Sequence, residues 1–195
     1  MVHILPCNAP QRHRSCDTYP RISPTRTEPQ YVEGLNRFLR DRGSTAVVKP
    51  VAAGKDPLKV VQKCVEIRDL AERDEKGYDF CVCLVDVDAH DALPAACRAA
   101  SSESILLLVS RLKFEAWLRW HAEDKRAALG PSRLDVRVQE LGLTKGKMLS
   151  PRFPFHAVHD ACEIAHRADP GLAACRVGPD PSSAMPILVD LMLGR

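Results

Sequence analysis

The sequence predicts an α/β fold: a three-layer sandwich with a mostly parallel sheet and a helical C-terminal part. Two observations support this prediction. Residues 80–85 and 105–109 are apolar at every position, as expected of strands that are buried on both faces in the centre of a parallel sheet. Segments with helical spacing of apolar residues alternate with these runs, which favours strand–helix–strand units with right-handed crossovers.

The N-terminal half of the chain supplies two helices and one strand. A capping box at residues 27–30 begins a helix that ends near Gly43, since a threonine caps the first turn and an early proline fits it. Residues 46–51 predict a strand. Asp56 caps a second helix, which ends near Gly77.

After the strand at 80–85, the pattern predicts a short helix over 92–100 and a strand over 105–109. We expect no strand beyond Val109. Helical spacing returns in the C-terminal part, in these segments: 114–121, part of 134–141, 155–168 and 186–193. One apolar helical face carries three residues that we expect in the core, namely Phe114, Trp117 and Leu118.

Length and local composition indicate one domain. A chain of 195 residues is long enough for a single substantial core. Residues 1–18 show neither a helical nor a strand period, which predicts a loose N-terminal arm. Residues 19–195 then form the domain, with an α/β core at about 19–123 and a helical part at about 124–195.

Composition excludes several classes of protein. Hydrophobic residues make up 45% of the chain and charged residues 27%, with 28 basic and 25 acidic side chains, so the chain is neither disordered nor collagen-like. The net charge of +3 is too small to indicate a nucleic-acid partner by itself. Any phosphate-binding surface must therefore be local.

The cysteines and the lack of long apolar segments predict a cytoplasmic protein. The eight cysteines form no C-x-x-C pair, which favours buried thiols in a reducing compartment over a zinc site, a redox site or a disulfide framework. We find no signal peptide and no stretch of about 20 apolar residues that would span a membrane. We therefore expect no membrane partner.

Asp86 and Asp88 follow the central strand and are the predicted metal ligands. Ligands of α/β proteins bind at the carboxyl ends of strands, and residues two apart on a strand point to the same side. Two carboxylates in one pocket suit Mg²⁺ (or Mn²⁺), which completes its shell with waters and phosphate oxygens. His90 and Asp91 are available to assist. The alternative is that D-x-D is common and that such aspartates only cap the next helix.

This strand-end D-x-D resembles that of the Toprim fold, in which it joins a glutamate of the first strand to bind magnesium for phosphodiester chemistry. Three further stretches, in the same order, resemble the RloB family: Thr27-Glu-Pro-Gln-Tyr31 with Glu33-Gly-Leu35, Phe114-Glu-Ala-Trp-Leu118 with His121, and Asp180-Pro-Ser-Ser183. Together they span about residues 21–193. The resemblance implies a Toprim-like sheet and a role in bacterial antiviral defence or abortive infection, often beside a partner ATPase.

One pair of residues departs from the family pattern. In RloB-like sequences a Glu-Gly pair precedes the T-E-P stretch, and its glutamate matches the Toprim general acid or base. Here these positions are Ser23 and Pro24. A serine cannot take a proton as a carboxylate does, and a proline lacks the conformational freedom of a glycine. The resemblance therefore leaves open an impaired nuclease or a subunit that binds without cutting.

Glu28, Glu115 and His121 are the candidate catalytic residues. Glu28 is retained from the T-E motif, although the helix dipole also explains an acidic residue in a first turn. Glu115 belongs to the second motif, with a surface ion pair to Arg119 as the alternative. His121 is suited to bind phosphate or to shuttle a proton, with capping of a helix end as the alternative.

Cations near the strand ends are the candidate phosphate-binding residues. Arg111 and Lys113 follow the last apolar strand, and we expect them to bind substrate phosphate. Lys145, Lys147 and Arg152 cluster in a loop-like region further along. For all five, a solvated surface charge is the alternative.

Three functions are compatible with these residues. The first is metal-dependent hydrolysis of phosphodiester bonds in DNA or RNA by a nuclease of RloB type. The second is a non-catalytic subunit that binds nucleic acid or an ATPase. The third is a metal-dependent phosphatase that acts on small phosphoesters, which leaves the motifs at 114–118 and 180–183 without explanation.

Overall fold

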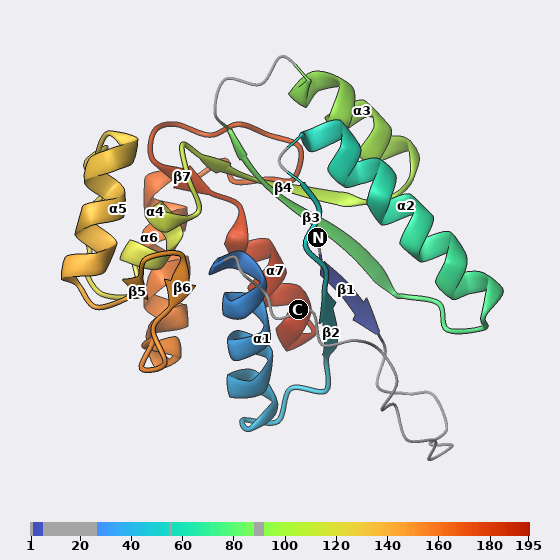
Figure 1. Cartoon of the computed structure of the whole chain (residues 1–195), viewed down its shortest axis with the longest axis horizontal. Helices are drawn as coiled ribbons and strands as arrows, with labels where there is room; N and C mark the ends of the chain where they lie inside the picture. The colour runs from blue at the N-terminus through green and yellow to red at the C-terminus, as the bar shows by residue number, and fades with distance from the viewer. Residues whose placement is uncertain (1, 6–26, 55, 88–91) are drawn as a thin grey trace.

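The computed structural model describes residues 2–5, 27–54, 56–87 and 92–195 (Figure 1). Five strands form one sheet in the order β2-β1-β3-β4-β7. Their bounds are Val2–Leu5 for β1, Val47–Pro50 for β2, Phe80–Val87 for β3, Leu106–Arg111 for β4 and Ser182–Ser183 for β7. The predicted strands at 46–51, 80–85 and 105–109 are therefore confirmed.

The described sheet is mixed, so the prediction of a mostly parallel sheet is wrong for this part of the chain. Only β3 and β4 pair in parallel, while β1 pairs antiparallel with both β2 and β3, and β7 pairs antiparallel with β4. A fully apolar run reports burial on both faces of a strand. It does not report the direction of the neighbouring strand, because helices that cover both faces bury a mixed sheet equally well.

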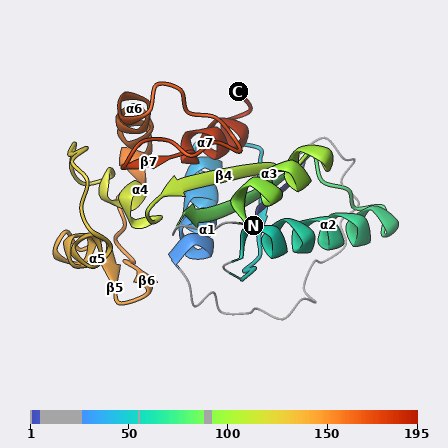
Figure 2. The same cartoon turned by 90° about the horizontal axis from the view of Figure 1, so that it is seen from above.

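Helices cover both faces of the sheet (Figure 2). On one face, α2 (Pro57–Arg73) and α3 (Leu93–Ser102) pack against Cys81, Cys83 and Leu107. On the other face, α1 (Thr27–Arg40) and α7 (Met185–Leu193) pack against Val82 and Leu108. The odd and even residues of β3 therefore belong to different cores, as the alternation of side chains along a strand requires.

The predicted start of the second helix is confirmed in its cap. The side-chain Oδ1 of Asp56 accepts hydrogen bonds from the backbone N–H groups of Leu58 at 2.9 Å and Lys59 at 3.1 Å. These are two of the amide groups that a helix cannot satisfy by itself. The carboxylate thus defines where α2 begins.

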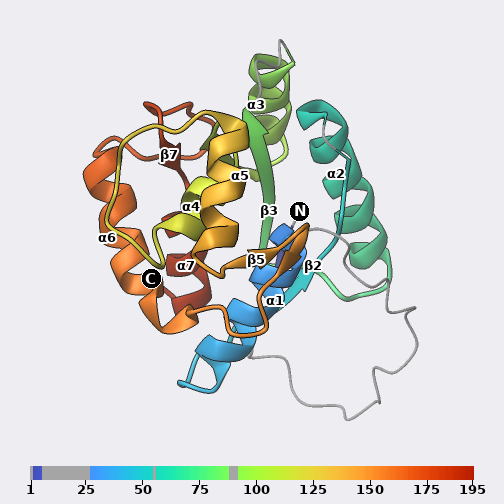
Figure 3. The same cartoon turned by 60° about the vertical axis from the view of Figure 1, so that its left-hand side comes forward.

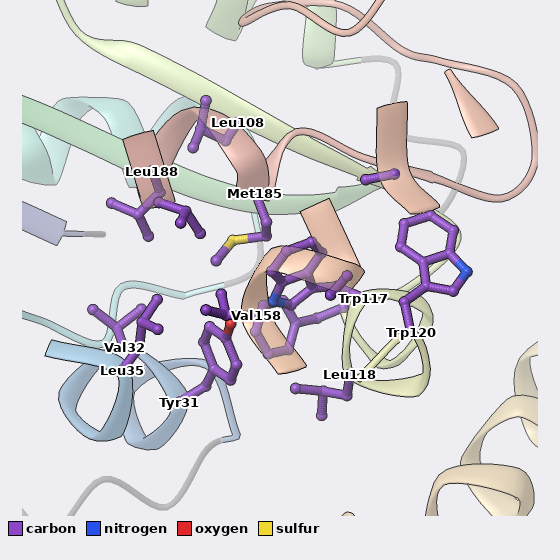
Figure 4. Packing of buried hydrophobic residues seen from close by; sticks show 14 of the residues in the cluster. Tyr31, Val32, Leu35, Leu108, Trp117, Leu118, Trp120, Val158, Met185 and Leu188 are labelled. Atoms are coloured by element: carbon purple, nitrogen blue, oxygen red, sulfur yellow. The ribbon is translucent and has the colours of Figure 1, made fainter. Parts of the chain in front are cut away.

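An aromatic cluster fills the core between α1 and the C-terminal helices (Figure 4). Tyr31 of α1 is fully buried and packs edge-on against Trp117 and Phe153, with ring centroids 6.2 Å and 5.5 Å apart. Phe114, Trp117 and Leu118 are all buried there, so the predicted apolar face is confirmed. Edge-to-face contacts of this kind add to the free energy gained from burial.

The C-terminal part contains four helices: α4 (Glu115–Arg119), α5 (Pro131–Glu140), α6 (Val158–Ala168) and α7, with a short 3₁₀ turn at Phe155–Ala157 before α6. It also contains strands, which corrects the expectation that strands end at Val109. The strands β5 (Thr144–Lys145) and β6 (Met148–Leu149) form a hairpin, and β7 adds to the edge of the sheet. Strands of two residues are too short to show a period in the sequence.

Val2–Leu5 differ from the loose N-terminal arm predicted for residues 1–18. They form β1, between β2 and β3. Four residues carry too little alternation to reveal a strand, and β1 is defined by its ladder with two neighbours. Residues 6–18, the remainder of the predicted arm apart from Met1, lie outside the described residues, as does Met1 itself.

The described cysteines fit the prediction of unbridged thiols. None of the six forms a disulfide, and Cys64, Cys81 and Cys83 are buried. Across the ranges that the structure describes, no helix has both the length and the apolar character needed to cross a membrane.

Candidate functional site

The floor of the candidate site is the carboxyl end of the one parallel strand pair in the described sheet. Asp86 of β3 lies in register beside Ser110 of β4. Both line a cleft of about 510 Å³. Because Val82 and Leu84 pack on the α1 side of the sheet, the alternation along β3 directs Asp86 to that same side. The strand end therefore presents a carboxylate where α/β proteins bind their ligands.

The first turn of α1 forms one wall of the cleft and carries Glu28. Thr27 and Glu28 both line the cleft, and Pro29 follows in the first turn of the helix, where a missing N–H is tolerated. Further along the helix, Tyr31 and Val32 are fully buried in the core. This packing fixes the position of α1, so that Glu28 is held in the cleft.

The turn between β4 and α4 brings in Lys113 and Glu115. β4 ends at Arg111, and Leu112 adopts a left-handed backbone conformation with φ of 64°. The chain then reverses into α4, and Lys113, Phe114 and Glu115 line the cleft. The predicted residues Glu28, Asp86, Lys113 and Glu115 thus meet in one cleft, although they come from three different parts of the chain.

Burial raises the pKa of Glu115. A hydrogen bond to its own backbone and the positive charge of Lys113 act in the opposite direction, while the carboxylates of Asp135 and Glu28 raise the pKa further. The net effect keeps the proton on Glu115 at a higher pH than on an exposed glutamate. A carboxyl group with a raised pKa is better suited than an exposed glutamate to return a proton that it has accepted.

Lys113 forms an ion pair with Asp135 of α5. Burial lowers the pKa of Lys113, but the hydrogen bond to Asp135 and the nearby carboxylates of Glu115 and Asp86 outweigh burial, so that the pKa is raised overall. The ammonium group is therefore charged and lies among the acidic residues of the cleft. It can contact a bound phosphate if Asp135 gives way or shares it.

The opposite wall of the cleft comes from α5 and the β5–β6 hairpin. Asp135 and Gln139 line it from α5, and Thr144, Gly146 and Lys147 line it from the hairpin. In Figure 3 the hairpin lies between α5 and the start of α1. Because this wall is assembled from a helix face and a turn, its residues show no common motif in the sequence.

His121 does not line the cleft. It is 5% exposed and lies in the aromatic cluster, where its Nε2 is 3.1 Å from the hydroxyl of Tyr31 and its Nδ1 is 3.2 Å from the carbonyl oxygen of Trp117. Burial lowers its pKa to about 4. His121 follows Trp117 by four residues, so a helical turn places both rings in the core, away from Glu115.

Arg111 is also directed away from the cleft. It lies in a separate shallow groove with Trp120 and Asp180. Successive side chains of a strand point to opposite faces, so Ser110 lies on the cleft side and Arg111 does not. The strand period itself could have revealed this difference.

The surface ion pair between Glu115 and Arg119, the alternative to a role in the site, is not what the structure shows. Arg119 is buried, and its Nε donates to Glu123 Oε1 at 2.5 Å. Glu123 also accepts a hydrogen bond from Arg137 Nη2 at 2.6 Å. Glu115 is therefore left to the cleft.

Asp88 lies outside the described residues, as do Ser23, Pro24, His90 and Asp91. Its role as a second metal ligand remains a prediction. Within the described ranges, no three or more His, Cys, Asp or Glu side chains are grouped closely enough to hold a metal ion. The donor chemistry still suits a hard cation, because Glu28, Asp86 and Glu115 offer only carboxylate oxygens to the cleft.

Sequence reasoning missed several polar residues of the cleft, and two of them are instructive. Ser110 follows an apolar strand and pairs in register with Asp86, so the rule that ligands bind at strand ends could have found it. Its Oγ lies 3.0 Å from Ser183 Oγ in β7, which explains why the Asp180-Pro-Ser-Ser183 motif accompanies the site. Asp135 lies on a polar helix face and carries no signal in the sequence.

Comparison with known proteins gives one match. The model of a protein family described as "RloB-like protein" matches residues 23–192, which includes every described residue of the cleft. No curated protein matches the chain, and no solved structure matches it.

Proposed function

The chain belongs to the RloB-like family, and on that premise we propose that it is a metal-dependent phosphodiesterase that cleaves nucleic acid. One observation carries the proposal. Glu28, Asp86 and Glu115 come from α1, β3 and α4, yet they line the same cleft at the carboxyl end of the parallel strand pair. Carboxylates that line one cleft make its potential negative and so favour the binding of a cation there.

Asp86 is the first proposed ligand of Mg²⁺ or Mn²⁺, and Asp88 is the second. Magnesium accepts one or two carboxylates, retains several waters and completes its shell with phosphate oxygens. When bound, such an ion polarises the phosphodiester and lowers the pKa of a coordinated water. Ser110 lies beside Asp86 in register and lines the same cleft.

Glu115 and Lys113 are assigned to proton transfer and to phosphate binding. The raised pKa of Glu115 favours exchange of a proton with an attacking water or a leaving oxygen. The Lys113 ammonium, held by Asp135, supplies a positive charge for the phosphate. Glu28 enters the cleft from α1 and replaces the carboxylate that is absent at Ser23.

The finer parts of the proposal rest on the family resemblance. They are a Toprim-like arrangement of the sheet, a role in bacterial defence and a partner ATPase. A parallel strand pair with an acidic residue at its carboxyl end supports the first of these. A cytoplasmic location belongs with the proposal as well.

A second candidate, a subunit that binds nucleic acid or an ATPase without cutting, is favoured by Ser23 at the position of the usual glutamate. A third candidate, a phosphatase of small phosphoesters, is favoured by the cleft volume of about 510 Å³, which is typical of small-molecule sites. The same experiment separates all three.

The test is cleavage of labelled single-stranded and double-stranded DNA and RNA with Mg²⁺, Mn²⁺ or EDTA. We expect Asp86→Asn and Asp88→Ala each to lower the cleavage rate by a factor on the order of 100 or more. Asp79→Asn, at an exposed residue just before the start of β3, is the matched control and should cleave normally.

Other outcomes would overturn the proposal. Binding of nucleic acid without cleavage, even with a partner ATPase added, would establish the binding subunit. Hydrolysis of p-nitrophenyl phosphate with no cleavage of polynucleotides would establish the phosphatase.

A further inference from the structure

Two exposed lysines lie at the tip of the β5–β6 hairpin, at the mouth of the cleft. The turn consists of Gly146 and Lys147, and Lys145 precedes it. Lys147 lines the cleft, and Lys145 is exposed next to it. We propose that this hairpin is a strand-binding rim, in which Lys145 and Lys147 hold the phosphate backbone of a nucleic acid across the cleft. This inference rests on the proposed function and adds to it the element that grips the substrate.

The hairpin is fastened to the helix that carries Glu28. The Gln30 side chain accepts a hydrogen bond from the backbone N–H of Leu149 at 2.7 Å, and its Nε2 lies 3.0 Å from the sulfur of Met148. One turn earlier, Thr27 Oγ1 donates to the carbonyl oxygen of Lys147 at 3.4 Å. These contacts join parts of the chain that are about 120 residues apart. The backbone that carries the lysines is therefore held at a set position relative to Glu28.

The turn geometry directs both lysines outward. Gly146 has a positive φ of 61°, a conformation that glycine adopts without strain and that two-residue hairpins require. Thr144 is buried while Lys145, Gly146 and Lys147 are exposed. The base of the hairpin thus packs against the protein, and its tip presents two ammonium groups to solvent.

The cleft carries several negative charges, so a polyanion can bind there only if cations lie nearby. Glu28, Asp86, Glu115 and Asp135 all line it, and the charge of Lys113 is already shared with Asp135. A polyanion that approaches these carboxylates is repelled. Within the part of the chain that the structure describes, neither Lys145 nor Lys147 forms an ion pair with a carboxylate, so both charges are available to offset this repulsion.

The chemistry of lysine identifies what the rim binds. An ammonium group on a flexible stem is a point charge that contacts phosphate oxygens without reading bases. Two such groups, one on the last strand residue before the turn and one within it, can each contact a phosphate of a strand. The rim therefore binds the backbone of DNA or RNA whatever its sequence, and the reactive phosphate is placed over Asp86 and Glu115.

The experiment measures binding of a fluorescent oligonucleotide in EDTA, without turnover, between about 50 and 200 mM salt. We expect the double variant Lys145→Gln/Lys147→Gln to bind about 10-fold more weakly than the wild type at low salt. The slope of log affinity against log salt should become shallower by about 1 to 2, one for each phosphate that the hairpin no longer neutralises. Lys145→Arg/Lys147→Arg keeps both charges and should bind like the wild type.

The matched control is Arg73→Gln/Lys76→Gln, which removes the same two charges near the end of α2. Both residues are exposed and precede β3, so they lie toward the amino end of that strand, away from the cleft. Equal losses of affinity in the two double variants would show that only the net charge matters. That result would overturn the proposed role of the hairpin. Undetectable binding by the wild type, or an unchanged affinity and salt slope in the hairpin variant, would overturn it as well.

These outcomes are independent of the proposed hydrolysis. Binding that depends on the hairpin, together with no cleavage under any metal, would sustain the rim and refute the phosphodiesterase. If cleavage depends on Asp86 but the affinity is unchanged in the hairpin variant, the phosphodiesterase proposal stands and the rim proposal is refuted. Thermal melting of each variant shows whether a loss of binding reflects a loss of folding.

Discussion

The hydroxyl group of Tyr31 lies 3.1 Å from Nε2 of His121, inside the aromatic cluster between α1 and α4. On the other side of the ring, Nδ1 lies 3.2 Å from the carbonyl oxygen of Trp117. A carbonyl oxygen only accepts, so Nδ1 carries the proton and donates it, and Nε2 accepts from the Tyr31 hydroxyl. The neutral ring thus satisfies two buried polar groups at once, and a second proton would break the bond from Tyr31.

The first prediction concerns the pH dependence of stability. Burial lowers the pKa of His121 to about 4 from an ordinary 6.5, so the unfolded chain binds more protons between these values. Stability is therefore complete above pH 6.5 and falls as the pH drops, by about 2 kcal/mol between pH 7 and pH 5. Urea unfolding at these two pH values measures the change.

The variant His121→Gln should lose this pH dependence, although it is less stable than the wild type at pH 7. The control His166→Gln alters an exposed histidine on α6 and should keep it. The prediction is wrong if His121→Gln responds to pH in the same way as the wild type.

The second prediction separates activity from stability at Glu115. Because its pKa is raised in the folded protein, the folded state binds the proton more tightly than the unfolded state. The associated stability is present below the ordinary pKa of a glutamate and is lost as the pH rises through the raised value. Glu115→Gln removes that loss, so its Tm at pH 7.5 without metal should rise by about 1–4 °C.

The same variant should lower the cleavage rate about 100-fold or more if Glu115 transfers a proton. Glu33→Gln, on the exposed side of α1, should change neither the Tm nor the rate. If Glu115→Gln melts at a lower temperature than the wild type, Glu115 stabilises the fold, and its proposed role in proton transfer loses support.

The third prediction explains the glycine in the Glu33-Gly-Leu35 motif. A Cβ atom added at Gly34 would overlap the ring of Phe155, which packs beside Tyr31 and Phe153. An alanine normally favours a helix over a glycine. Here we expect Gly34→Ala to destabilise the protein by about 1–3 kcal/mol, because the packed ring must move.

Chemical denaturation measures that change. Gly77→Ala meets nothing within 4 Å and serves as the control. Replacing the ring in Gly34→Ala/Phe155→Leu should recover part of the loss. An unchanged or increased stability in Gly34→Ala would contradict the overlap.

The fourth prediction concerns the ion pairs between α4 and α5. Hydrogen bonds from Arg137 and Arg119 lower the pKa of Glu123 to about 2. The Arg119 and Glu123 side chains are only 6% and 11% exposed, so removal of the Glu123 charge leaves a buried guanidinium uncompensated. We expect Glu123→Gln to cost about 2 kcal/mol, between the values for exposed and buried pairs.

Glu140 offers a matched comparison, because it also pairs with Arg137 but is 57% exposed. Glu140→Gln should cost less than about 0.5 kcal/mol. Urea unfolding at pH 7 measures both variants, and equal losses would show that burial does not control the strength of these pairs.

Much of the fold follows from local pattern. The apolar runs at 80–85 and 105–109 are strands, the aspartate cap marks the start of α2, and the helix predicted from Thr27 begins at that residue. The spacing of apolar residues in each segment shows which side of that helix or strand is buried, and this spacing depends only on residues close together in the sequence. The two-residue strands and β1 could not be predicted, since each is defined by a partner strand and not by its own residues.

Part of the site was also predictable, because some of its residues lie at strand ends that local pattern reveals. Asp86 and Lys113 follow strands in the sequence, and the rule for strand ends led to them, whereas Glu115 was assigned to the site by its place in the motif at 114–118. His121 and Arg111 were predicted beside them, but the structure places His121 in the aromatic cluster and Arg111 in a separate groove. The helical period separates His121 from Glu115, and the strand period separates Arg111 from Ser110, because side chains at these spacings point in different directions.

The sequence alone was enough to predict the main helices, the strands at 46–51, 80–85 and 105–109, the acidic strand end and the family resemblance. It took the packed fold to show that the sheet is mixed, that Glu28 and Glu115 line the same cleft, and that Asp135 and Lys147 line it with them. This difference arises because the spacing of apolar residues along the chain shows only which side of a helix or strand is buried. The pairing of distant carboxylates depends instead on how whole helices pack on the sheet, and that packing is set by many contacts far apart in the sequence.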